Sequence, residues 1–212
     1  MKILTRPGVE LLHHSKDGAK EIEEAGRTCY RSEDKITKDS SGEFVRMLID
    51  RGHTAMIEFA SATFRVTTDR GVTHEIVRHR LASYAHESTR YCNYSKKKFG
   101  REITCVKPNS INEHDPGDGY KIWVSSCEQA EKAYFDLLDV GYLPQIARSV
   151  LPTCLATTIV MKTNFREWLH FLYLRHSPHA HPDMRAVAEE VGRLLIGVCP
   201  EVFEDYARKG LS

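Results

Sequence analysis

Apolar residues recur at alternating intervals of three and four in several parts of the chain, which is the spacing of an amphipathic helix. The clearest stripe runs from Met184 to Val198, and another runs from Trp123 to Leu137 with Gly141 at its end. The other predicted helices and their N-terminal caps are 17–30 with Asp17, 41–52 with Ser40 in a capping box with Glu43, 72–80 with Asp69, and 165–175 with Asn164.

Strand-like alternation and β-branched runs occupy the stretches between these helices. The predicted strands are 2–4, 9–13, 57–68, 102–106 and 153–162. The polar, turn-rich stretch from Pro108 to Gly119 is predicted to be a long surface loop. We therefore predict an α+β fold with a central, mostly antiparallel sheet packed with helices, as a single domain of residues 1–212 with a helical elaboration.

Composition narrows the class of protein. Lys and Arg number 30 against 29 Asp and Glu, so the net charge of +1 gives no sign of a polyanion binder held by bulk charge. Mean hydropathy of −0.42 is ordinary for a globular protein, and no apolar run approaches the roughly 18 residues of a membrane helix. The six cysteines are scattered without a C-x-x-C pair, which predicts reduced thiols in a cytosolic protein and neither a zinc site nor a disulfide framework.

The stretch RHRLASYAHESTRYCNY, residues 78–94, has the highest density of chemically versatile side chains. Arginine is favoured where phosphate or carboxylate is gripped by a fork of donors. On the predicted helix, Arg78, His79 and Arg80 point about 100° apart, so they serve two ligands, or one ligand and a neighbouring subunit. The structural alternative is that these cations only interact with the helix dipole and with Glu75.

Arg78-His79-Arg80, followed after seven residues by Ser88, resembles the RHR-x7-S signature of the flavin-dependent thymidylate synthases. Arg90-Tyr91 fits the same family, and the resemblance extends from about Tyr30 to Arg185. Its second region comprises Arg148 before Val150-Leu151-Pro152, Asn164-x-Arg166, His170, and Leu174-Arg175 before His179-Ala180. Two positions differ: His86 stands where glutamate is common, with Glu87 beside it, and Glu75 stands where glutamine is common.

The resemblance implies an enzyme that methylates dUMP at C5 to give dTMP. Methylenetetrahydrofolate would supply the carbon and NADPH the reducing equivalents, through FAD. The resemblance also implies a cytoplasmic homotetramer with its ligands at subunit interfaces, acting without nucleic acid, membrane or metal. Arg175 is the implied catalytic cation. The implied dUMP-binding residues are Glu75, Arg78, Glu87, Ser88, Thr89, Arg90, Arg148 and Arg175, and the implied FAD-binding residues are His53, Arg78, His79, Arg80, His86, Asn164, Arg166, His170 and His179.

Three alternatives stay open. A metal-dependent hydrolase would use the stretch HSPHAHPD, with His176, His179, His181 and Asp183 as ligands. A non-catalytic nucleotide- or RNA-binding protein would use the arginines of the 78–94 stretch and the lysine run 96–98. A related pyrimidine-nucleotide methyl- or hydroxymethyltransferase would share the family resemblance but differ in its product.

Overall fold

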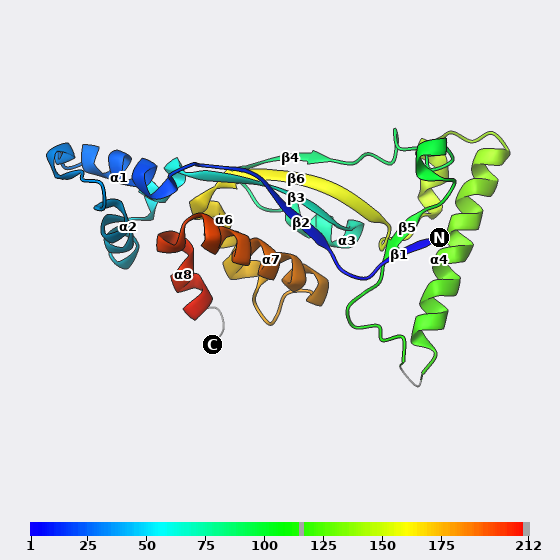
Figure 1. Cartoon of the computed structure of the whole chain (residues 1–212). Coiled ribbons are helices and arrows are strands. Elements are labelled where there is room, and N and C mark those ends of the chain that lie inside the picture. The colour runs from blue at the N-terminus through cyan, green and yellow to red at the C-terminus, as the bar shows by residue number, and fades with distance from the viewer. Residues whose placement is uncertain (115–116, 210–212) are drawn as a thin grey trace. The chain divides into compact units, whose positions relative to one another are not determined.

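The computed structural model describes residues 1–114 and 117–209, with side chains through residue 204. Figure 1 shows the order of the elements along the chain. The strands are β1 Lys2–Leu4, β2 Gly8–His14, β3 Ser61–Asp69, β4 Ala82–His86, β5 Thr104–Val106 and β6 Ala156–Asn164. The α-helices are α1 Gly18–Thr28, α2 Ser41–Asp50, α3 Arg70–Ile76, α4 Gly119–Asp139, α5 Pro144–Ala147, α6 Phe165–Arg175, α7 Pro182–Val198 and α8 Pro200–Lys209. Short 3₁₀ helices are η1 Glu33–Lys35, η2 Thr54–Phe59, η3 Lys97–Phe99 and η4 Arg148–Val150.

The main sheet has four strands in the order β2-β3-β6-β4. Its neighbours run antiparallel, because backbone hydrogen bonds join the end of one strand to the start of the next. These bonds run from Ser15 N to Ser61 O, from Phe165 N to Ala60 O and from Glu87 N to Thr158 O. A second, two-stranded sheet pairs β1 with β5 in parallel, with Lys2 opposite Thr104. The predicted α+β class with a mostly antiparallel sheet is therefore confirmed.

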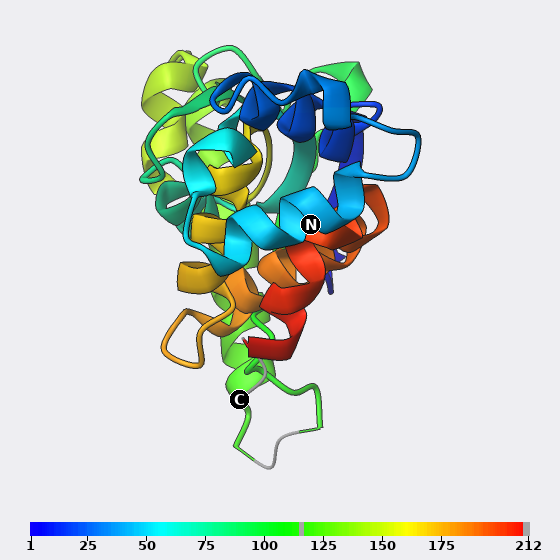
Figure 2. The ribbon, with the colours of Figure 1, turned by 90° about the vertical axis from the view of Figure 1, so that its left-hand side faces the viewer.

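Three helices from opposite ends of the sequence are neighbours. α2 contacts both α1 and α8, as Figure 2 shows. The close approach of α1 to α2 depends on Gly26, because a Cβ atom at this position would lie 2.6 Å from Cε1 of Phe44.

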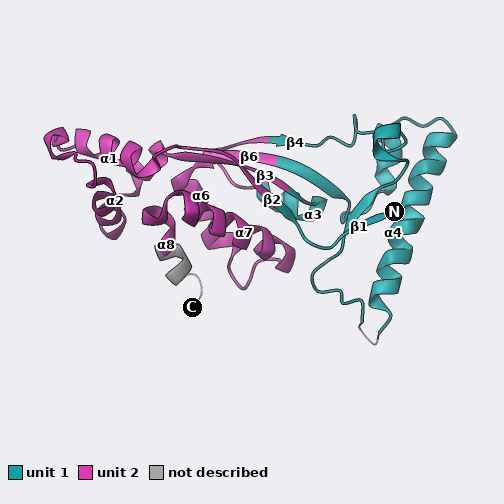
Figure 3. Ribbon diagram, viewed as in Figure 1, with its two compact units in different colours: residues 1–8, 67–76, 85–159 teal, residues 9–66, 77–84, 160–212 magenta. Residues whose placement is uncertain are grey.

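The chain forms two compact units, coloured separately in Figure 3. Unit 1 comprises residues 1–8, 67–76 and 85–159, and unit 2 comprises residues 9–66, 77–84 and 160–212. Strands β3, β4 and β6 each begin in one unit and end in the other.

In unit 2 the core lies between the sheet and α6, and α6 also contacts α7. Trp168 is fully buried and donates from Nε1 to the Ala62 carbonyl at 3.1 Å. Its ring also meets Phe64 edge-on, with centroids 4.9 Å apart. Because the Trp168 ring is buried and its N–H has a hydrogen-bond acceptor on β3, this side chain holds α6 against β3.

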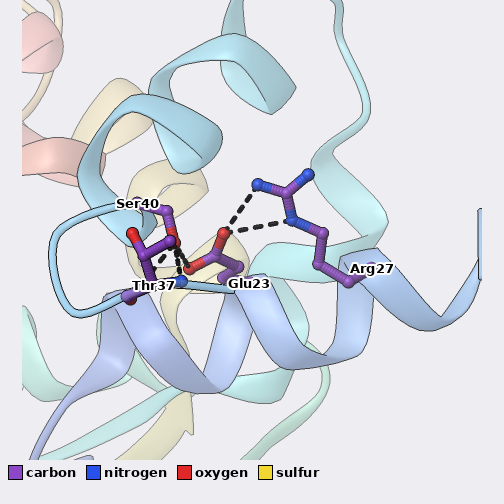
Figure 4. Close-up of polar contacts among 4 residues, drawn as sticks. All are labelled: Glu23, Arg27, Thr37 and Ser40. Atoms are coloured by element: carbon purple, nitrogen blue, oxygen red, sulfur yellow. Dashed lines mark hydrogen bonds and ion pairs between the residues drawn. The ribbon is translucent and has the colours of Figure 1, made fainter. Parts of the chain in front are cut away.

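The buried carboxylate of Glu23 forms an ion pair within α1 and also connects this helix to the segment before α2 (Figure 4). The Glu23 carboxylate accepts hydrogen bonds from Nε and Nη2 of Arg27 and from Oγ of Ser40. Ser40 occupies the predicted N-cap position of α2, but its hydroxyl makes no capping bond to the helix. The hydroxyl is instead used by Glu23, because a buried carboxylate must find donors.

The core of unit 1 gathers around α4, whose predicted stripe is confirmed. The buried residues of this core are Tyr94, Ile103, Cys105, Cys127, Tyr134, Phe135, Ala147 and Leu155. Trp123 and Leu137 pack against this cluster from the same helix.

The predicted start of the strand 57–68 was wrong. Residues 54–59 form η2, and β3 starts only at Ser61, where its pairing with β2 and β6 begins. The predicted loop 108–119 is irregular over residues 108–114, and residues 115–116 lie outside the described part of the chain. Among the described residues, no helix combines the length and apolar character needed to cross a membrane.

Candidate functional site

The RHR segment lies in the connection between α3 and β4 rather than on a helix. α3 begins as predicted, with Asp69 accepting from the Val72 amide at 2.8 Å, but it ends at Ile76. The prediction that the helix continues to Arg80 was therefore wrong. Leu81, with a φ of +60°, lies at the turn that leads into β4. Thr163 Oγ1 donates to the Leu81 carbonyl at 2.8 Å and holds this strained residue in place.

The stretch after RHR is a strand over Ala82–His86. Its side chains alternate: Tyr84 and His86 are half-buried, whereas Ser83 and Ala85 are exposed. Tyr84 Oη donates to the His79 carbonyl at 2.9 Å, which anchors the RHR segment to the strand that follows it.

The three residues of the RHR segment do not share one environment. The central His79 is buried, with 5% of its surface exposed, whereas Arg78 and Arg80 on either side are exposed. Within the described residues, neither arginine's guanidinium has a hydrogen bond or an ion pair. The segment thus turns a histidine inward and presents two guanidinium groups outward.

His79 connects a carboxylate to the predicted catalytic cation. Its Nε2 lies 3.0 Å from Nε of Arg175, and its Nδ1 lies 3.0 Å from Oε1 of Glu167. Arginine only donates, so Nε2 must be the acceptor and the ring proton must reside on Nδ1, pointing at Glu167. Burial, followed by the positive charge of Arg175, lowers the pKa of His79 and favours this neutral form.

Glu167 is in turn positioned by the start of α6. Oδ1 of Asn164 accepts from the Glu167 amide at 2.9 Å, as the predicted N-cap. Asn164, expected to bind flavin, therefore also sets the first turn of the helix that carries Glu167 and, two turns later, Arg175.

His170 completes this part of unit 2. Its ring lies 5.7 Å from the His79 ring, centroid to centroid, and ligand atoms of His79, Glu167 and His170 lie within 4.8 Å of one another. Such a group has the composition of a metal site. Both ring nitrogens of His79 are, however, engaged by Glu167 and Arg175, so the arrangement is better explained as a hydrogen-bonded chain that orients the guanidinium.

The remaining predicted flavin contacts of unit 2 are exposed. His53 follows α2 and precedes η2, and His179 lies in the turn before α7. Arg166 is on the first turn of α6 and forms an ion pair with Glu58.

Unit 1 contains a pocket of about 480 Å³ that includes two of the predicted nucleotide ligands. Thr89 is buried and accepts from Nη1 of Arg148 at 3.1 Å, although these residues are 59 positions apart. Arg70 and His74 also line the pocket and were missed from the sequence. Their spacing of four on one helix, which places both on one face, was the available signal.

His86 and Glu87 take different roles in unit 1. His86 Nε2 lies 3.1 Å from Oγ1 of Thr157, the hydroxyl to which Arg70 also donates. Burial, then the charges of Arg70 and His74, lower the pKa of His86. Glu87 instead accepts from Tyr94 Oη at 3.2 Å and lines a second pocket of about 550 Å³ with Lys97 and Lys98.

The other predicted nucleotide ligands lie nearby in the chain. Ser88 Oγ accepts from the Arg90 amide at 3.3 Å, which shapes the turn after β4. Arg90 is exposed, with its guanidinium over the Tyr91 ring. Glu75 is half-buried in the last turn of α3.

The stretch proposed for a metal-dependent hydrolase does not converge. Across the described parts of the chain, three-ligand groups are formed by His79, Glu167 and His170 and by Cys105, Cys127 and Cys154, and the 176–183 stretch contributes to neither. His181 is instead the N-cap of α7, where its Nδ1 accepts from the Asp183 amide.

Comparison with known proteins gives a consistent result. The model of the family described as thymidylate synthase complementing protein matches residues 10–201. The chain belongs to this family. It is 35% identical to a flavin-dependent thymidylate synthase of Mycolicibacterium gilvum, over 97% of this chain and 86% of the relative. It is 33% identical to the enzyme of that name from Geobacter sulfurreducens, over 93% of this chain and 85% of the relative.

The fold of the thymidylate synthase complementing family is also seen in a solved structure. The UMP/dUMP methylase PolB from Streptomyces cacaoi, bound with 5-Br dUMP, superposes with a TM-score of 0.82 at 24% identity. The match covers 98% of this chain and 97% of PolB. All predicted site residues, from His53 to His179, lie inside the segment that the family matches.

Proposed function

We propose that this protein is a flavin-dependent thymidylate synthase, which methylates dUMP at C5 to give dTMP. The observation that carries the proposal is family membership over residues 10–201, together with relatives of this name at 33% and 35% identity. The RHR-x7-S motif, from Arg78 to Ser88, lies within the matched segment.

The pocket of unit 1 suits the phosphate of a nucleoside monophosphate. Arg70, His74 and Arg148 line it together with the hydroxyl of Thr89. Guanidinium groups bind phosphate through two parallel hydrogen bonds, and a threonine hydroxyl adds one more donor. We propose that these residues, with Ser88 and Arg90 from the adjoining turn, hold the dUMP phosphate.

Arg175 is the proposed catalytic cation. Negative charge develops on the N3/O4 side of uracil when C6 accepts electrons, and a preorganised cation stabilises that charge. The hydrogen-bonded chain from Glu167 through His79 restrains the Arg175 guanidinium before any substrate binds. Because His79 is neutral, it accepts a hydrogen bond from Arg175 and does not place a second positive charge beside the guanidinium.

The donor set of unit 2 fits FAD. A flavin dinucleotide carries a pyrophosphate, and the exposed guanidinium groups of Arg78 and Arg80 have no acceptor among the described residues. Arg166, His53 and His170 add donors from other elements of the same unit. When bound, the flavin would supply the two-electron chemistry that a protein side chain cannot.

The family assignment supports further proposals about the co-substrates and the assembly. We propose methylenetetrahydrofolate as the carbon donor, NADPH as the reductant and the cytoplasm as the place of action. We also propose a homotetramer, which the exposed apolar side chains around the end of α4 and α5 support. These are Val140, Tyr142, Leu143, Ile146 and Val150.

Two measurements test the function. Purified protein is expected to show the near-ultraviolet and blue absorbance bands of oxidised flavin. Incubation with dUMP, methylenetetrahydrofolate and NADPH is expected to yield dTMP, identified by chromatography and mass. A protein that stays colourless with added FAD and forms no dTMP would refute the proposal, and a hydroxymethylated product would assign it to the related transferase class.

Arg175→Ala tests the catalytic assignment. The variant is expected to lose about 10²–10³-fold in kcat, the typical effect of removing one charge-stabilising donor, while it retains flavin. Arg193→Ala is the matched control, because Arg193 is exposed on α7 and forms an ion pair with Glu190. Wild-type kcat in the Arg175 variant would remove it from the mechanism.

A further inference from the structure

Three cysteines that are far apart in the sequence converge in unit 1. Cys105 lies on β5, Cys127 on α4, and Cys154 just before β6. Their sulfur atoms lie within 4.8 Å of one another, and the Sγ atoms of Cys127 and Cys154 are 3.5 Å apart. The sequence predicted scattered, unconnected thiols, so this cluster is a product of the fold.

The three thiols differ in access. Cys105 and Cys127 are buried, at 0% and 2% exposure, whereas Cys154 is only partly buried. Their neighbours are largely apolar and include Ile103, Leu155 and Tyr134. A small solute from the solvent therefore reaches Cys154 first.

The electrostatics of the cluster also distinguish Cys154. Hydrogen bonds from Cys105, then from Cys127 and Trp123, lower the pKa of Cys154. Burial raises the pKa of Cys127. The thiolate, which is the reactive form of cysteine, therefore resides on the most accessible of the three sulfurs.

We propose that Cys154 is an oxidant-reactive thiol and that Cys127 resolves its oxidised form into a disulfide. With hydrogen peroxide as oxidant, the Cys154 thiolate attacks one peroxide oxygen and the O–O bond breaks. Cys154 becomes a sulfenic acid, and the released hydroxide takes up a proton to form water. Cys127 sulfur then attacks Cys154 sulfur, the S–O bond breaks, and a second water leaves. The two thiols lose two protons and two electrons in total, and one peroxide becomes two waters.

The geometry requires a modest movement. A disulfide has an S–S bond of about 2.05 Å, so the sulfurs of Cys127 and Cys154 must approach by about 1.5 Å from their present 3.5 Å. Rotation about the side-chain bonds of two residues is the simplest source of such a shift, since α4 and the segment before β6 already hold them together. The product is neutral, which suits an apolar core.

A metal ion is the competing occupant of three sulfurs. Structural zinc takes four protein ligands, but the ligand group found in the described residues contains these three sulfurs alone. Three thiolates on a divalent ion would also leave a net negative charge among apolar side chains, which is unfavourable. Disulfide formation avoids both difficulties.

The proposed bond has a structural consequence. Thr153 and Leu155, on either side of Cys154, line the 480 Å³ pocket. The disulfide would thus tether one wall of that pocket to α4.

The test treats the full-length protein with one equivalent of hydrogen peroxide at neutral pH. Remaining thiols are then alkylated, and the peptides are mapped by mass spectrometry without reduction. The expected product is a Cys127–Cys154 linked peptide, two hydrogens lighter than the sum of its parts, while Cys29 and Cys92 are recovered alkylated. Full alkylation of Cys154, or prior oxidation of Cys92, would overturn the proposal, as would a Cys154–Cys105 link. Metal found at one equivalent per chain in untreated protein would favour the metal site instead.

Two matched variants test the resolving role. Cys127→Ala is expected to abolish the linked peptide and to leave a sulfenic acid on Cys154 that dimedone traps. Cys105→Ala removes an equally buried thiol of the same cluster and is expected to form the same Cys127–Cys154 bond, but more slowly than wild type, because Cys154 loses the hydrogen bond that most lowers its pKa. Circular dichroism shows whether each variant folds. Loss of the bond in folded Cys105→Ala would overturn the assignment of Cys127, and the wild-type peptide map decides the matter if either variant fails to fold.

Discussion

The buried ion pair of α1 provides a quantitative test of how unit 2 is held together. The Glu23 side chain is 1% exposed and accepts from Arg27 Nε and Nη2 at 3.1 and 2.9 Å and from Ser40 Oγ at 2.9 Å. The Arg27 guanidinium also lies 4.3 Å from the centre of the Phe44 ring. One carboxylate therefore neutralises a guanidinium and positions both the segment before α2 and a core ring of α2.

Glu23→Ala would leave Arg27 without its partner. Breaking a buried pair from one side typically costs roughly 3–5 kcal/mol, because the remaining charge is uncompensated. The Arg27 side chain is 15% exposed, so water can partly solvate it, which places the expected loss at about 3 kcal/mol. In a chain of this size, each kcal/mol lowers Tm by about 2–4 °C, so Tm should fall by about 6–12 °C.

Urea unfolding followed by circular dichroism measures the free energy of unfolding directly. Glu24→Ala is the matched control, since Glu24 is the next residue of the same helix but is exposed. The double variant Glu23→Ala with Arg27→Met should recover much of the loss, because it removes both charges. If Glu23→Ala and Glu24→Ala differed by less than about 0.5 kcal/mol, the ion pair would have no stabilising role.

Three further outcomes are expected. Gly26→Ala should destabilise the protein by about 1–3 kcal/mol in urea unfolding, since its Cβ would lie 2.6 Å from Phe44, whereas Gly197→Ala, with no atom within 4 Å, should not. Ser88→Ala should weaken dUMP binding by roughly tenfold in calorimetry while leaving measurable turnover, and unchanged affinity would exclude a contact with the nucleotide. The folded-state pKa of His79 lies below its ordinary 6.5, so the contribution of this histidine to stability is complete above pH 6.5 and is lost as pH falls below that value. The urea midpoint should therefore drop on acidification, and it should drop less steeply in His79→Gln.

Local signals in the sequence predicted local structure well. Asn164 and Asp69 cap α6 and α3 as expected, because a cap depends on residues two or three positions away. The end of α3 was predicted four residues too late, because Ala82–His86 pairs with β6, more than 70 positions along the chain. That pairing competes with helix propensity and is invisible to a local pattern.

Candidate side chains were easier to name than to place. The motif identified His79, but its contact with Glu167, 88 residues away, has no local signature. The same holds for the contact of Arg148 with Thr89, across 59 residues. The convergence of the cysteines was likewise hidden, since spacing in sequence says nothing about strands and helices that meet only in the folded core.

The alternation of exposure within the RHR segment has an evolutionary consequence. A substitution at His79 disturbs contacts inside the chain's own fold, so its effect should appear as reduced abundance of protein in the cell. A substitution at Arg78 or Arg80 leaves those contacts intact and should yield a protein that accumulates normally but binds poorly. Three adjacent codons would therefore be under two kinds of selection, and a deep mutational scan that measures abundance and growth separately should resolve them.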